Sequence, residues 1–92
     1  MQIKYTKGYL DKLESIFASS EYNLRYEKGN FKSGYCVLKE TKIVIINKYF
    51  TLEGKINALL DILKALDFNP KDFKNQKQQD FLIELKQTEL KL

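Results

Sequence analysis

The chain has 92 residues, of which 43% are hydrophobic and 13% aromatic, a balance that predicts one folded domain and not a disordered segment. There is one cysteine and no histidine, which excludes an internal disulfide, a zinc site that uses histidine and any catalytic pair that relies on histidine. The net charge is +4, but the lysines are interleaved with acidic residues, and this favours a solvated surface over a nucleic-acid-binding one.

Residues 7–20 are predicted to form the first helix, because hydrophobic side chains recur there with the spacing i, i+3, i+4 and i+7. Ser19, Ser20 and Glu21 then end the helical pattern. The face expected to be buried consists of Tyr9, Leu10, Leu13, Ile16 and Phe17.

From there to residue 47 the hydrophobic period is two, which predicts β-strands. Alternating runs over 22–28 and 31–38 flank Gly-Asn at 29–30, a hairpin signal in which glycine supplies the positive φ of the first turn position. Glu-Thr at 40–41 makes a poorer turn into a third strand, 42–47, which is apolar on both faces over most of its length. The sequence therefore predicts an antiparallel three-stranded meander.

A helix over 52–67 is expected next, with Thr51 as its N-cap. Asn69 and Pro70 then predict a new helical start. Helical spacing is clear again in the tail, 81–92. Its apolar face has few residues, and the tail is expected either to pack on the domain or to pair with another chain.

The order of these elements predicts a single α+β domain over 1–92 with two layers. It would consist of an N-terminal helix, the antiparallel meander and two C-terminal helices, with the helices at 7–20 and 52–67 covering one face of the sheet. The start of the chain lacks a signal peptide, and its longest aliphatic run, Ile43 to Ile46, falls far short of the roughly 20 residues that cross a bilayer. We therefore expect a cytoplasmic protein with no membrane partner.

The predicted hairpin register gathers a few polar residues on the sheet face opposite the tyrosines. With the turn at 29–30, Arg25 faces Gly34, Glu27 faces Lys32 and Asn23 faces Cys36; with the turn at 40–41, Cys36 faces Ile45 and Gly34 faces Asn47. This face would be apolar at one end, around Leu38, Ile43 and Ile45, and polar at the other. The candidate binding residues are Arg25, Glu27, Lys32, Gly34 and Asn47, with no catalytic residue, no metal ligand and no cofactor.

Arg25 and Gly34 stand out among these candidates. The chain has fifteen lysines and a single arginine, so a planar, forked cation is expected to be needed at position 25, either to bond Glu27 or stack on a tyrosine, or to hold a carboxylate or phosphate. A glycine within a strand lets another group approach the backbone, and that group could be the guanidinium or a small ligand. Cys36 is expected to be a packed hydrophobe, with a modifiable thiol as the alternative.

The stretch from Arg25 to Cys36, RYEKGNFKSGYC, followed by IVIINK at 43–48, resembles a family of short bacterial proteins. The resemblance extends from Leu10 to about Leu66. That family has no assigned activity, so the resemblance implies a fold and little about function.

The strand ending at Asn47 and the helix after it also resemble the metallopeptidases that cleave phage-type immunity repressors, in which such a strand precedes a helix bearing H-E-x-x-H. The matching positions here hold Leu60, Asp61 and Lys64, so both metal-binding histidines are missing and the glutamate is replaced by aspartate. The resemblance implies a zinc-free relative of those enzymes.

Three functions follow as hypotheses. The first is a non-enzymatic binding or protein-interaction module that self-associates as a homodimer. The second is a binder of a small molecule or anion, or a weak enzyme, that uses Arg25, Gly34 and Asn47. The third, less favoured, is a nucleic-acid accessory protein that uses Lys28, Lys32 and Lys48.

Overall fold

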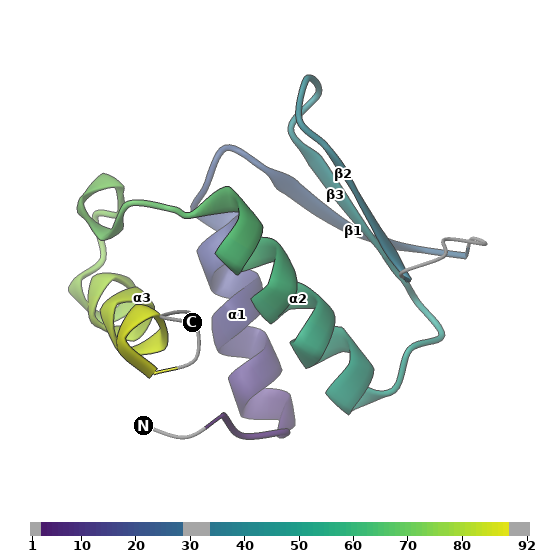
Figure 1. Ribbon diagram of the computed structural model, residues 1–92, viewed down its shortest axis with the longest axis horizontal. Coiled ribbons are helices and arrows are strands. Elements are labelled where there is room, and N and C mark those ends of the chain that lie inside the picture. The colour runs from purple at the N-terminus through teal and green to yellow at the C-terminus, as the bar shows by residue number, and fades with distance from the viewer. Residues whose placement is uncertain (1–2, 29–33, 89–92) are drawn as a thin grey trace.

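The computed structural model describes residues 3–28 and 34–88 and shows an α+β fold with a three-stranded mixed sheet (Figure 1). None of the helices within these two ranges is long and apolar enough to cross a membrane. The elements are α1 (Lys7–Ala18), β1 (Asn23–Glu27), β2 (Tyr35–Leu38), β3 (Ile43–Asn47), α2 (Leu52–Leu66), the short 3-10 helix η1 (Pro70–Asp72) and α3 (Gln76–Thr88).

The helices begin where side-chain oxygens can accept the first backbone N–H groups. The hydroxyl of Thr6 accepts from Tyr9 N at 3.1 Å at the start of α1. Thr51 Oγ1 accepts from Gly54 N at 3.1 Å at the start of α2, so the predicted N-cap is confirmed. Asp67 ends α2 in the left-handed region, with φ 49°.

The C-terminal region differs in detail from the prediction. Asn69 and Pro70 begin a single 3-10 turn, in which Asn69 Oδ1 accepts from Lys71 N at 3.0 Å. The last helix starts at Gln76, ahead of the predicted tail at 81–92, because the side chain of Asn75 accepts from Lys77 N at 2.8 Å and caps it.

The antiparallel meander is wrong. The strand order is β1-β3-β2, with β1 parallel to β3 and β2 antiparallel to β3. The strand that is apolar on both faces takes the central position, where two neighbours cover its edges, whereas β1 carries charges on alternate positions and lies at an edge. The predicted turn at 29–30 falls outside the described residues.

In this order β1 pairs with β3 and not with β2, whereas the predicted pairing of β2 with β3 is kept. Arg25 lies opposite Ile45 and not opposite Gly34, and Asn23 lies opposite Ile43 and not opposite Cys36. The predicted pair of Cys36 with Ile45 is confirmed. Each strand keeps its predicted faces, because alternation along a strand does not depend on its neighbour.

The core lies between α1, α2 and one face of the sheet, as predicted (Figure 1). Helix α3 packs against α1 on the side away from the sheet; Tyr9 and Phe81 meet edge to face there, with ring centroids 5.5 Å apart. The described part of the tail, 81–88, therefore packs on the domain and does not cover the second face of the sheet. The fully buried side chains include Leu13, Ile16, Phe17, Val44, Ile46, Ile56, Leu59, Ile62 and Leu85.

Candidate functional site

Three of the candidate site residues, Arg25, Glu27 and Asn47, lie on the face of the sheet that α1 and α2 leave uncovered, which we call the open face (Figure 1). The register of the two strand pairs places eight side chains there, from all three strands. They are Asn23, Arg25 and Glu27 of β1, Ile43, Ile45 and Asn47 of β3, and Cys36 and Leu38 of β2.

Arg25 and Glu27 form the polar part of the open face. Arg25 Nη2 lies 2.7 Å from Glu27 Oε2, and the two side chains are 57% and 41% exposed. One of the structural roles expected for Arg25, a bond to Glu27, is therefore present. Because both partners reach solvent, the pair contributes at most about 1 kcal/mol to stability.

Gly34 is buried, and its neighbour is an aromatic ring. Its φ is +82°, and a Cβ built on it would lie 1.7 Å from Cζ of Phe50. The close approach expected at this glycine is thus made by the ring of Phe50, and neither the guanidinium of Arg25 nor a ligand has that space. A side chain at this position would need both a strained backbone and a displaced ring.

Asn47 takes part in the turn between β3 and α2. Its backbone N donates to Gly34 O at 2.9 Å, and its Oδ1 accepts from Tyr49 N at 3.0 Å. It shares the open face with Arg25 and lies opposite Glu27. Lys32 lies outside the described residues.

The predicted residues are therefore not assembled into one pocket. Arg25 and Glu27 lie on β1, whereas Gly34 lies across β3, at the start of β2, beneath Phe50. Residues 3–28 and 34–88 contain no group of His, Cys, Asp and Glu that could hold a metal ion.

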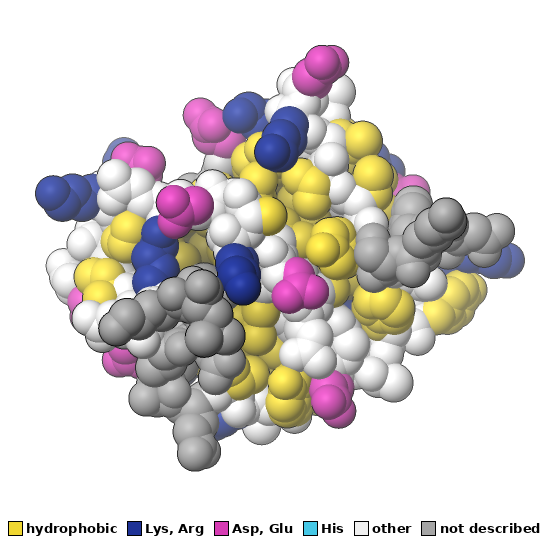
Figure 2. Space-filling model, in the orientation of Figure 1, with side chains coloured by type: hydrophobic (Ala, Val, Ile, Leu, Met, Phe, Trp, Pro, Cys, Tyr) yellow, Lys and Arg dark blue, Asp and Glu magenta, His cyan; other side chains and the backbone are white. Residues whose placement is uncertain are grey.

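The apolar part of the open face lies toward β2. Leu38 is 42% exposed, and Cys36, Ile43 and Ile45 are half-buried. A hollow of about 320 Å³, lined by residues 37–41, adjoins it. Hydrophobic side chains reach the surface over this end of the sheet (Figure 2).

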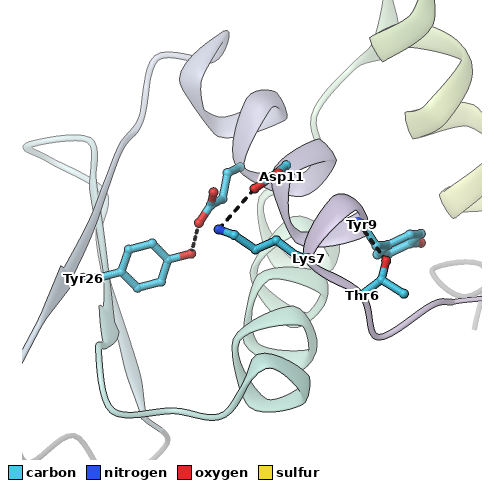
Figure 3. Close-up of polar contacts among 6 residues, drawn as sticks. Thr6, Lys7, Tyr9, Asp11 and Tyr26 are labelled. Carbon is cyan, nitrogen blue, oxygen red and sulfur yellow. Dashed lines mark hydrogen bonds and ion pairs between the residues drawn. The ribbon is translucent and has the colours of Figure 1, made fainter.

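A second polar site, which the sequence did not indicate, joins β1 to α1. The hydroxyl of Tyr26 donates to Glu14 Oε2 at 2.5 Å (Figure 3). Lys55 Nζ lies 5.1 Å from the centre of the tyrosine ring. Burial raises the pKa of Tyr26 well above its usual range, and the hydrogen bond to Glu14 raises the pKa further. Strand alternation placed Tyr26 in the core, but only the packing of α1 on β1 could show which carboxylate its hydroxyl would meet.

A hollow of about 470 Å³ runs beside this contact, along β1 and α1. We call it the β1 groove. Glu14 is its only charged lining residue within the described ranges, and Ala18, small and exposed, leaves room beside the strand. The groove is lined by Glu14, Ala18, Ser20, Tyr22, Asn23, Leu24 and Tyr26.

The positions matched to a metallopeptidase motif all lie on α2. Leu60 is 9% exposed, whereas Asp61 and Lys64 point to the surface. Comparison with family models, with curated proteins and with solved structures gave no significant match. The two resemblances therefore stay predictions.

Proposed function

We propose that this chain is a small, non-enzymatic protein-interaction module that binds its partner through the open face of the sheet. The observation that carries the proposal is the apolar end of that face, around Leu38, Ile43 and Ile45, which no described element covers. Because the C-terminal helix packs on the far side of α1, this surface has no cover within residues 3–28 and 34–88.

The composition of the open face suits a binding surface. Charged groups border its apolar part: Arg25 and Glu27 lie on β1, and the exposed Lys39 and Glu40 directly follow β2. Interfaces between proteins have this arrangement, an apolar centre inside a polar rim. Each Å² of apolar surface removed from water by a partner would contribute about 25 cal/mol.

The geometry gives less support to a small-molecule or anion site. The guanidinium of Arg25 is engaged by Glu27, and the ring of Phe50 fills the space beside Gly34. An anion would have to displace the carboxylate and would find no enclosed space next to it. The interaction module is for this reason the better-supported function.

The test compares two substitutions of equally exposed residues. Leu38→Glu places a charge in the open face, whereas Ile83→Glu places one on α3; the two native side chains are 42% and 41% exposed. The wild-type protein and both variants are immobilised, and the proteins that they retain from an extract of the native host are quantified by mass spectrometry.

We expect a partner that the wild type and Ile83→Glu retain equally and that Leu38→Glu loses by about tenfold or more, because a buried, unpaired carboxylate opposes binding. Circular dichroism checks that both variants remain folded. Equal retention by the two variants would contradict the assignment of the open face as the binding surface.

A further inference from the structure

Strand β1 lies at an edge of the sheet, and its backbone groups alternate between β3 and the outer side of that edge. Asn23 N donates to Lys42 O at 2.8 Å, and Glu27 O accepts from Lys48 N at 3.1 Å, so residues 23, 25 and 27 direct their backbone groups toward β3. By alternation, the N–H and C=O groups of Leu24 and Tyr26 point away from the sheet, and no described strand lies beside them. Such an edge is a template for another strand.

The space next to this edge can admit a strand. The β1 groove follows the outer side of β1, with Leu24 and Tyr26 among its lining residues. Helix α1 borders the groove through Glu14 and Ala18, and Ala18 presents only a methyl group. A strand added to β1 would therefore lie above α1 with room for its side chains.

The side chains of β1 specify which strand fits. Two copies of β1 can pair antiparallel about a two-fold axis perpendicular to the sheet. The faces of the two sheets then match only if each residue lies opposite one whose side chain points to the same side of the sheet. With the axis at Tyr26, Arg25 of each copy lies directly opposite Glu27 of the other. With the axis at Arg25, the two arginines would oppose each other, and with the axis at Leu24, Arg25 would face Asn23.

We propose that two copies of this chain dimerise through their β1 edges, antiparallel and centred on Tyr26, with Arg25 of each copy paired to Glu27 of the other. The backbone groups of Tyr26 would bond across the axis, flanked by bonds between Leu24 and Lys28 of the second copy. The opposite charges lie at non-hydrogen-bonded positions, where cross-strand side chains approach most closely. Arg25 Nη2 already lies 2.7 Å from Glu27 Oε2 of its own chain, and both side chains are exposed, so the dimer would bring two such pairs together with opposite charges facing each other. This charge complementarity is the reason for choosing a second copy as the partner.

The dimer has a consequence for the open face. An axis perpendicular to the sheet leaves the helices of both copies on one side, so the two open faces join into one six-stranded surface. The inference goes beyond the proposed function, since it concerns the edge of β1, and either can fail without the other.

The experiment uses charge reversal and its rescue. Arg25→Glu creates a Glu–Glu contact across the axis, and Glu27→Arg creates an Arg–Arg contact, so each variant alone is expected to dissociate about tenfold more readily than the wild type, or more. An equimolar mixture of the two restores both opposite-charge pairs, and so does the double variant Arg25→Glu/Glu27→Arg. Lys86→Glu, which changes a charge on α3, is the control.

The assay is sedimentation equilibrium from micromolar to millimolar protein at low ionic strength, with circular dichroism to confirm folding. The expected result is a wild-type dimer, weakened in each single variant, recovered in the mixture and in the double variant, and unchanged by Lys86→Glu. A monomeric wild type, or tighter association after Arg25→Glu, would overturn the proposal. A dimer that survives Arg25→Glu but is broken by Leu38→Glu would place the contact on the open face, overturning the β1 pairing and keeping the proposed function.

Discussion

Gly34→Ala should destabilise the protein more than the same substitution at either of the other described glycines, Gly8 and Gly54. The φ of +82° costs an L-residue about 1–2 kcal/mol. The new Cβ would also lie 1.7 Å from Cζ of Phe50 and 2.5 Å from Cε2, so the ring must leave its place. Loss of about half of the burial of a phenylalanine adds about 1 kcal/mol.

The expected total is therefore about 2–3 kcal/mol, which corresponds to a decrease in Tm of about 10–20 °C for a domain of this size. Urea unfolding followed by circular dichroism measures the free energy of unfolding. Gly8→Ala is the control, because nothing lies within 4 Å of its added Cβ and the residue is helical. That variant should gain up to about 1 kcal/mol.

A double-mutant cycle separates the steric cost of the Phe50 ring from the cost of backbone strain at Gly34. In a Phe50→Ala background the steric part disappears, so Gly34→Ala should cost only the about 1–2 kcal/mol of backbone strain. An equal cost of Gly34→Ala with and without the ring would refute the packing of Phe50 on Gly34.

Three other measurements test the remaining contacts. Burial and Glu14 raise the pKa of Tyr26, so at alkaline pH the folded state keeps the tyrosine proton that the unfolded chain loses. The free energy of unfolding should therefore fall as the pH rises above about 10, and urea titrations should show a smaller decline for Tyr26→Phe. Arg25→Lys should change the free energy of unfolding by less than about 1 kcal/mol, because the ion pair is exposed; a larger loss would show a stronger structural role. Leu85→Ala should cost about 2–5 kcal/mol and Ile83→Ala less than about 1 kcal/mol, and similar values would contradict the packing of α3.

Much of the fold could be predicted because the elements depend on local patterns. The spacing of apolar residues placed α1 and α2, and Thr51 marked the start of α2. The pairing of strands is not local. Gly-Asn between two alternating runs indicated neighbouring strands, whereas the central position gives β3, the most apolar strand, a paired neighbour along each of its edges.

The candidate site, too, could be predicted only where it depends on local patterns and not on packing between distant segments. That Arg25 and Asn47 share a face could be predicted, because alternation along a strand needs no knowledge of its neighbours. That Phe50 fills the space at Gly34, and that Glu14 meets Tyr26, depends on the path of the chain after β3 and on how α1 crosses β1. These contacts join residues far apart in sequence, and no spacing encodes them.

Amide hydrogen exchange of individual residues tests most directly whether β3 lies between β1 and β2 and leaves β1 at an edge. In this order the N–H groups of Val44 and Ile46 point to β1 and should exchange slowly, whereas the N–H of Val37 points away from β3 and should exchange much faster. Slow exchange at Val37 together with fast exchange at Val44 would mean that β2 is central, and would contradict both the open β1 edge and the dimer built on it.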